Sequence, residues 1–147
     1  MKYTPSKINR WMLLKLPAAW LSGVRLTLID EKKCEVKVRF KWINQNPYRS
    51  MFWAVQGMAA ELTTGMLLTK SINDSNANIS MLLVSNKSSF HKKAVGKITF
   101  TCNEGEIAKK LINSTIDNIT SKAWFKVKGY DEDGDLVSEF EFEWSCK

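Results

Sequence analysis

The sequence has few of the residues that mark repetitive or unstructured chains. Its 147 residues include only 7 glycines and 3 prolines, which excludes collagen-like and linker-like chains. Hydrophobic residues make up 44% and charged residues 25% of the chain, as in ordinary globular proteins. With no internal repeat or low-complexity run, we expect one domain with a single core.

Histidine and cysteine are also scarce. The single histidine, His91, lies in a basic segment, and no G-x-S-x-G sequence supplies a nucleophile for it. The three cysteines have no C-x-x-C spacing, so we expect reduced thiols rather than disulfides or a zinc site; they are Cys34, Cys102 and Cys146. Glycine-rich phosphate loops are absent, and "DEDGD" (131–135) is too short for a calcium loop. The sequence predicts no metal and no separate cofactor.

No apolar run is long enough to cross a membrane. The longest candidate, 51–68, contains Gln56, Glu61 and two threonines, and a span needs about 18 uninterrupted apolar residues. The first 23 residues are a poor signal peptide, because Lys15 interrupts their apolar part and no clean cleavage site follows. We therefore expect a cytoplasmic protein without a membrane span.

The formal net charge of +7 favours acidic partners. Nucleic acid and small polyanions such as phosphorylated cofactors both suit it, and solubility alone also explains it. The basic residues are dispersed over expected strands and loops, and no known nucleic-acid-binding motif is present. Nucleic acid is therefore not the expected partner.

Residues 4–16 have the pattern of a helix. Thr4 is placed to cap it, Pro5 suits its first position, and Pro17 ends the pattern. The residues expected on one side are Ile8, Trp11 and Met12. The basic residues beside the tryptophans Trp11 and Trp20 would allow contact with a membrane surface; they are Lys7, Arg10 and Lys15. Docking of this helix on its own domain is the favoured interpretation.

Alternating segments indicate six strands. "VRLTLID" (24–30) and "CEVKVRF" (34–40) form a hairpin with one wet face. The later segments are "ISMLLVS" (79–85), "GKITFTC" (96–102), a short helix "EIAKKLI" (106–112), "SKAWFKVKGY" (121–130) and "LVSEFEFEW" (136–144). The last two are joined around Asp133-Gly134, a strong turn signal.

A long helix is expected between these groups of strands. It begins at about 51 or 52, ends at about 72, and is apolar around nearly its whole circumference. Such a helix is enclosed on most sides. The sequence therefore predicts an α+β fold in which an antiparallel sheet of about six strands wraps around a long central helix.

Glu61 is the one carboxylate in the middle of this helix. It either reaches an edge and pairs with a lysine, or lies in a dry cleft where it acts as a base or nucleophile. An unpaired buried charge is costly. The residues alone leave both interpretations open.

The order of elements resembles the hotdog fold over about residues 20–145. More narrowly, the chain looks like acyl-CoA thioesterases of the phenylacetate-pathway type and their uncharacterised DUF4442-like branch. The segments "SSFHKKAVGKITF" and "GYDEDGDLV" are also similar to that family. The resemblance implies one domain over residues 1–147. It consists of the N-terminal helix at about 4–16 followed by the hotdog core at about 20–145.

Enzymes of that family carry an asparagine in the loop, a His-Gly-Gly at the helix start and an acid nine residues after the histidine. Asn46 stands at the first position and Glu61 at the last. The His-Gly-Gly positions hold bulkier residues here, namely Phe52, Trp53 and Ala54. Glycine alone leaves no side chain in the way of a substrate, so this departure bears on catalysis.

The resemblance implies side-by-side homodimers, and tetramers in some cases, with active sites between subunits. Glu61 would act as general base or nucleophile on a thioester, and Asn46 of the other subunit would orient water or the carbonyl. Backbone N–H groups of 52–54 would form the oxyanion hole. Coenzyme A would enter only as part of the substrate.

Further residues would bind the substrate. The acyl chain would lie against Trp53, Met58 and Met66, and the phosphates of coenzyme A would meet Arg49, Lys92 and Lys93. The last three are also explained as surface charges, and this is the favoured interpretation for each. The alternative to an acyl-CoA thioesterase is a non-catalytic hotdog protein that binds fatty acyl groups or acyl-CoA, and a basic nucleic-acid-binding module comes third.

Overall fold

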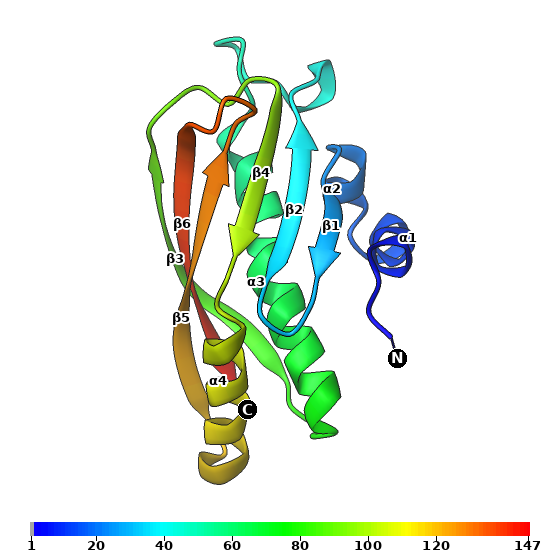
Figure 1. The fold of residues 1–147 in the computed structure, drawn as a ribbon, viewed down its shortest axis with the longest axis vertical. Helices are drawn as coiled ribbons and strands as arrows, with labels where there is room; N and C mark the ends of the chain where they lie inside the picture. The colour runs from blue at the N-terminus through cyan, green and yellow to red at the C-terminus, as the bar shows by residue number, and fades with distance from the viewer. Residues whose placement is uncertain (1) are drawn as a thin grey trace.

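The computed structural model describes residues 2–147, which form five helical segments and six strands (Figure 1). In chain order these are α1 (Pro5–Lys15), α2 (Pro17–Leu21), β1 (Arg25–Ile29), β2 (Cys34–Arg39), η1 (Trp42–Asn44), α3 (Trp53–Ser75), β3 (Met81–Phe90), β4 (Lys97–Cys102), α4 (Gly105–Asn118), β5 (Ser121–Tyr130) and β6 (Leu136–Cys146).

The strands form one antiparallel sheet in the order β1-β2-β4-β5-β6-β3. The long helix α3 runs along one face of this sheet, α4 lies at its lower end, and α1 lies beside β1 (Figure 1). The expected α+β architecture is confirmed. Its two edges are β1 and β3, which therefore lie at opposite sides of the molecule.

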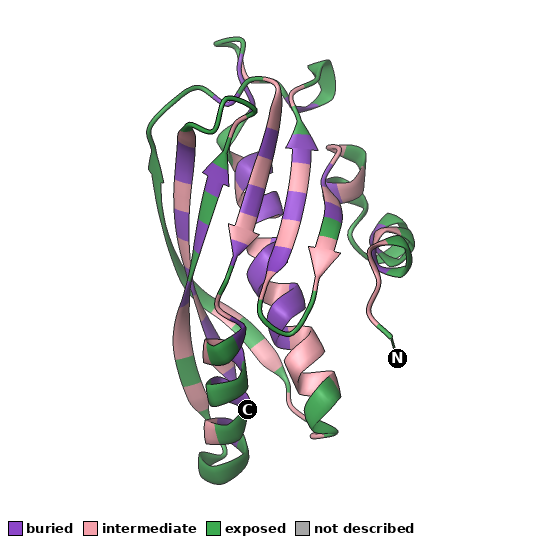
Figure 2. Ribbon diagram, viewed as in Figure 1, coloured by how far each residue is buried: buried purple, intermediate pink, exposed green. Residues whose placement is uncertain are grey.

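The core lies between α3 and the concave face of the sheet (Figure 2). Alternate residues of the strands point into it, such as Val36 and Val38 of β2 and Phe140 and Phe142 of β6. Gly129 of β5 lies opposite Phe100 of β4, and a Cβ there would lie 2.5 Å from the Phe100 ring. This close approach requires glycine, because a methyl group would push the ring out of the core.

The helix α3 is less enclosed than its sequence predicts. One face is buried against the sheet, whereas the opposite face is half-buried; the latter includes Ala54, Gly57, Met58, Glu61 and Gly65. An apolar helix face that its own chain covers only in part is a surface on which another molecule can pack. The sequence pattern predicted a helix enclosed on most sides, whereas one face of α3 is only half-buried in the structure of this chain.

Two elements are longer than the sequence indicated. The strand β3 continues through Phe90 instead of ending at 85, because its pairing with β6 extends from Met81 to Phe90. Its polar second half showed no alternation of hydrophobicity. The helix α4 has 14 residues rather than the 7 expected, since its buried positions Ala108, Leu111, Ile112 and Thr115 maintain a helical spacing.

The N-terminal helix docks on its own domain, as favoured above. Thr4 caps α1 and Pro5 opens it, and Ile8 and Met12 are buried. The Asn9 side chain exchanges two 2.9 Å hydrogen bonds with the backbone of Leu26 in β1. Trp11, expected on the same side as Ile8 and Met12, is instead exposed.

The three cysteines are free and buried. Burial raises the pKa of Cys102 to about 12 and that of Cys146 to about 11, so these thiols stay protonated and unreactive. Among residues 2–147, none of the helices has the length and apolar character needed to cross a bilayer.

Candidate functional site

The loop before α3 is ordered by Asn46. Its Oδ1 accepts hydrogen bonds from the backbone N–H of Tyr48 (2.8 Å) and Ser50 (3.2 Å), and its Nδ2 donates to Ser50 Oγ (3.0 Å). Short polar side chains that bond to the backbone two residues ahead are typical of tight turns. In this chain Asn46 therefore fixes the loop that leads into the helix.

The start of α3 offers free hydrogen-bond donors. The Phe52 N–H donates to the Asn44 carbonyl (2.8 Å), but among residues 2–147 no acceptor meets the N–H of Trp53 or Ala54. Two aromatic rings stand beside these donors. Phe52 (46% exposed) and Trp53 (55% exposed) meet edge to face with centroids 6.2 Å apart. The donors suit an oxyanion, and the rings narrow the approach to them.

A groove of about 520 Å³ opens at this helix start. We name it the helix-start groove. One wall comes from the loop and the first turns of α3, including Asn46, Trp53 and Gln56; the other comes from the end of β3 and the segment after it, including Phe90 and Lys93. The groove thus combines apolar walls with a basic rim.

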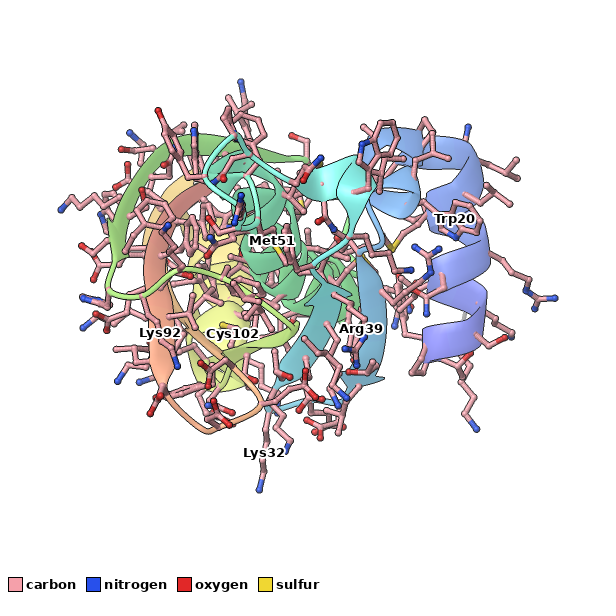
Figure 3. All side chains as sticks on the ribbon, turned by 90° about the horizontal axis from the view of Figure 1, so that it is seen from above. Trp20, Lys32, Arg39, Met51, Lys92 and Cys102 are labelled. Carbon is pink, nitrogen blue, oxygen red and sulfur yellow. The ribbon has the colours of Figure 1, made fainter. Side chains whose placement is uncertain are left out.

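The basic residues at this rim differ in their partners. Lys92 Nζ lies 2.5 Å from an Asp131 oxygen and 2.8 Å from an Asp135 oxygen, and these bonds raise the pKa of Lys92. Lys93 Nζ donates to the Tyr48 carbonyl (3.2 Å) and lines the groove. Seen from above, Lys92 lies at the opposite end of the molecule from Trp20 (Figure 3).

His91 and the "DEDGD" segment behave as the sequence indicated. His91 is exposed, and its Nε2 lies 2.9 Å from a Glu139 oxygen. Asp131 accepts hydrogen bonds from the backbone N–H of Asp133 and Asp135 (3.0 Å each). These bonds and the ion pair with Lys92 give the Asp131 carboxylate a structural role in the turn.

Glu61 lies in the middle of the half-buried face of α3. Among the described residues, no cation or hydrogen-bond donor pairs with its carboxylate. Burial raises the pKa of Glu61, because the surrounding apolar atoms disfavour the charged form. The pairing with a lysine that the sequence left open is therefore not formed within the described part of the chain.

A second groove, of about 260 Å³, contains Glu61. We name it the Glu61 groove. Its other walls are Met58 and Leu62 of α3 and the segment 16–19 at the start of α2, with Lys15 at its rim. An apolar pocket beside one carboxylate can hold an acyl chain while its reactive end meets the carboxylate.

Asn46 and Glu61 line different grooves of one chain. The residues brought together at the helix start are Asn46, Phe52, Trp53, Lys92 and Lys93. Met58 accompanies Glu61, whereas Met66 is buried in the core and Arg49 is exposed in the loop, so neither lines either groove.

Sequence reasoning missed the role of Gln56. This side chain is buried at the floor of the helix-start groove, and the Ser138 hydroxyl of β6 donates a 2.7 Å hydrogen bond to its Oε1. The sequence did contain a signal for this role, because Gln56 is, like Glu61, a polar residue in an apolar helix and lies one helical turn after Phe52.

A six-stranded antiparallel sheet wrapped on one long helix defines a protein of the hotdog-fold class. Within that class the chain belongs to the family DUF4442, a domain of unknown function, whose sequence profile matches residues 5–146.

Solved structures agree with this fold. A Pseudomonas aeruginosa protein of unknown function, named a probable thioesterase, is similar over 98% of this chain and 96% of its own, with a TM-score of 0.83 and 18% identity. A Haemophilus influenzae thioesterase is similar over 100% and 92%, with a TM-score of 0.74 and 10% identity.

A Staphylococcus aureus thioesterase, solved as a glutamine-to-alanine variant, is similar over 84% of this chain and 93% of its own, with a TM-score of 0.66 and 10% identity. The same protein was also solved as a glutamate-to-alanine variant. A search of curated proteins found no similar sequence.

Proposed function

We propose that this protein hydrolyses an acyl-CoA thioester to a carboxylic acid and free coenzyme A. The observation that carries the proposal is Glu61: a half-buried carboxylate with a raised pKa, without a partner among residues 2–147, beside an apolar groove. A buried carboxylate without a partner costs stability, whereas an apolar side chain at position 61 would pack against the same surroundings without that cost. Perturbed acids of this kind concentrate at catalytic sites.

In the proposed reaction Glu61 acts as general base on a water molecule. The water attacks the thioester carbonyl, its proton passes to the Glu61 carboxylate, and the carbonyl oxygen becomes an oxyanion. The helix start and Glu61 line different grooves within one chain, so the Trp53 and Ala54 N–H groups that receive this oxyanion would come from the other subunit of the dimer proposed below. Such donors are worth about 3 kcal/mol each. Collapse of the intermediate breaks the C–S bond, and the coenzyme A thiolate takes up the proton that Glu61 received, which restores the Glu61 carboxylate. Direct attack by Glu61 on the carbonyl is the variant of this route.

The proposed active unit is a homodimer. The edge strand β3 is exposed along nearly its whole length, including Leu82 (65% exposed) and Val84. The first half of this edge is apolar, and an exposed apolar strand edge favours pairing with another strand. Pairing of two β3 strands would extend the sheet and cover the half-buried face of α3. It would also bring the Asn46 loop of one subunit towards Glu61 of the other.

The spacing of two residues also supports this proposal. In the Staphylococcus aureus thioesterase, the replaced glutamine and glutamate lie 15 positions apart. Asn46 and Glu61 have the same separation in this chain. We propose that they perform corresponding tasks, with Asn46 orienting water or the carbonyl.

The test is release of free thiol from a panel of short, long and aromatic acyl-CoAs. Glu61→Gln should lower kcat by roughly 10²-fold or more, since it removes a general base. Glu106→Gln, which changes an exposed carboxylate in the first turn of α4, is the matched control and should leave kcat unchanged.

One observation favours the second candidate, a non-catalytic binder of acyl groups or acyl-CoA. Phe52 and Trp53 cover the helix start where a thioester carbonyl would have to approach. If the wild-type dimer hydrolyses no member of the panel yet binds one in calorimetry, this candidate replaces the enzyme. Trp53→Gly would then be expected to create or increase turnover.

A further inference from the structure

The N-terminal part of the chain has a one-sided charge. Residues 1–29 contain no aspartate or glutamate, and their basic residues are Lys2, Lys7, Arg10, Lys15 and Arg25. The rest of the chain mixes both signs. Local positive charge is therefore far denser here than the net charge of the protein suggests.

The orientation of α1 sets which of these side chains face outward. Ile8 and Met12 are buried, and Asn9 is bonded to β1, so one side of the helix is fixed against the domain. At 3.6 residues per turn the opposite side carries a mixture of cations and apolar groups, all exposed: Lys7, Arg10, Trp11 and Leu14.

Exposed apolar residues also occur on the elements that adjoin α1. Leu14 is 79% and Trp42 is 82% exposed, and Leu21 and Ile43 are also exposed. The elements that carry them are joined. Leu16 is both the C-cap of α1 and the N-cap of α2, and Asn44 Nδ2 donates to the Ser22 carbonyl (2.9 Å), which ties η1 to the end of α2. We call Lys7, Arg10, Trp11, Leu14, Lys15, Leu21, Trp42 and Ile43 the N-terminal face.

Trp20 does not belong to this face. The Arg25 guanidinium stacks on its ring, 4.2 Å from the centroid, and donates a 2.7 Å hydrogen bond to the Trp20 carbonyl. These two contacts hold Trp20 within the domain. The tryptophans that remain available are Trp11 and Trp42.

A second copy of the chain does not account for the N-terminal face. The dimer proposed above uses β3, whereas α1, α2 and η1 lie at the side of β1, the other edge of the sheet (Figure 1). In the view from above, α1 likewise occupies the end of the molecule away from β3 (Figure 3). The face stays open when two β3 strands pair.

We propose that the N-terminal face docks on the surface of a bilayer that contains anionic phospholipid. A short helix with tryptophan and leucine beside lysine and arginine matches the boundary between headgroups and acyl chains: the indole rings and leucines enter it, and the cations meet the phosphates. Each basic residue near an anionic surface contributes severalfold to binding. This docking does not depend on the hydrolysis proposed above, although it would bring the Glu61 groove, which borders α2, close to the lipid.

The experiment compares co-sedimentation with vesicles of phosphatidylcholine alone and with vesicles that also contain phosphatidylglycerol. We expect binding to the anionic vesicles only, weakening as salt is raised, with a blue shift of tryptophan fluorescence. The triple variant Lys7→Glu/Arg10→Glu/Lys15→Glu should bind roughly tenfold more weakly or worse. Trp11→Ser/Leu14→Ser should lose the blue shift expected of Trp11. At high salt, where the charges are screened, this variant should bind the anionic vesicles more weakly than the wild type does.

The matched control is Lys32→Glu/Lys110→Glu/Lys147→Glu. It lowers the net charge by the same amount at three exposed sites outside the N-terminal face, and it should bind much as the wild type does. Thermal unfolding establishes that each variant is folded. No binding to either vesicle, equal binding to both, equal loss in the two triple variants, or tighter binding to an RNA oligonucleotide than to anionic vesicles would each overturn the proposal.

Discussion

The Ser138 hydroxyl and the Gln56 carboxamide meet across the core, 2.7 Å apart, and join the first turn of α3 to β6. Both side chains are buried. A buried polar atom must be hydrogen-bonded to avoid a desolvation penalty. This pair therefore fixes how the start of α3, with its free N–H donors, is set against the sheet.

Removal of the Ser138 hydroxyl should destabilise the protein measurably. Ser138→Ala leaves Gln56 Oε1 buried without its donor, so we expect the free energy of unfolding to fall by about 1–3 kcal/mol. Urea unfolding monitored by circular dichroism measures it. Because Gln56→Leu/Ser138→Ala removes both polar partners, it should lose less than the two single changes combined; additive losses would show that the two side chains are not coupled.

The raised pKa of Glu61 makes stability depend on pH. Burial raises the pKa of this carboxyl above its unfolded value near 4.3, so the folded state holds the proton more tightly than the unfolded state. Stability from this group is complete at lower pH and is lost as pH rises through the folded pKa. Glu61→Gln, which cannot ionise, should therefore melt at a higher temperature than the wild type at pH 8, and this difference should shrink towards pH 4.

The same titration should govern catalysis. A general base works only when deprotonated, so kcat/KM for an acyl-CoA should rise with pH to a plateau, with an apparent pKa above 4.3. Glu106→Gln should reproduce both the wild-type melting profile and the wild-type pH profile. The difference in melting temperature between Glu61→Gln and the wild type should grow with pH. If it is constant or has the opposite trend, the pKa of Glu61 is not raised by burial.

The edge strand β3 should control the oligomeric state. Leu82→Lys/Val84→Lys places two cations on the apolar part of that edge, and charged edges resist pairing. Loss of about 1.4 kcal/mol or more of contact energy would weaken the dimer at least tenfold, as measured by light scattering over a dilution series. Thioesterase activity should fall with dimer content, because the proposed site joins two subunits.

The control for this edge is Val95→Lys/Ile116→Lys, which changes two residues of comparable exposure in a loop and on α4. It should leave the dimer intact. A wild-type protein that is monomeric at all concentrations would contradict the β3 pairing and with it the shared site.

Much of the fold follows from local patterns in the sequence. Alternation predicted β2 and β6, the Thr4–Pro5 pair predicted the start of α1, and Asp133-Gly134 predicted the last hairpin. The polar half of β3 was not predicted, because backbone pairing with β6 forms this part of the strand and its side chains show no hydrophobic alternation. Gly129 likewise carried no local signal, since its role depends on Phe100, a distant residue in sequence.

The candidate site was less accessible to sequence reasoning. Glu61 stood out because an acid in an apolar helix conflicts with its surroundings. The contact between Gln56 and Ser138 could not be inferred, since it joins residues 82 positions apart. The pairing of Lys92 with two aspartates across the last hairpin likewise depends on tertiary structure.

The Glu61 groove should set the preferred length of the acyl chain. Ala18 is an exposed residue at the wall that α2 contributes, so Ala18→Trp can fill part of the 260 Å³ groove without disturbing the core. We expect roughly tenfold or greater loss of kcat/KM for long-chain acyl-CoAs, because several buried methylenes contribute about 0.8 kcal/mol each. Hydrolysis of acetyl-CoA, which does not reach this wall, should change little. Asn118→Trp, at the exposed end of α4, is the control for adding an indole. Equal losses for long and short substrates in Ala18→Trp would place the acyl chain elsewhere, and the helix-start groove, lined by Phe52 and Trp53, would then be its site.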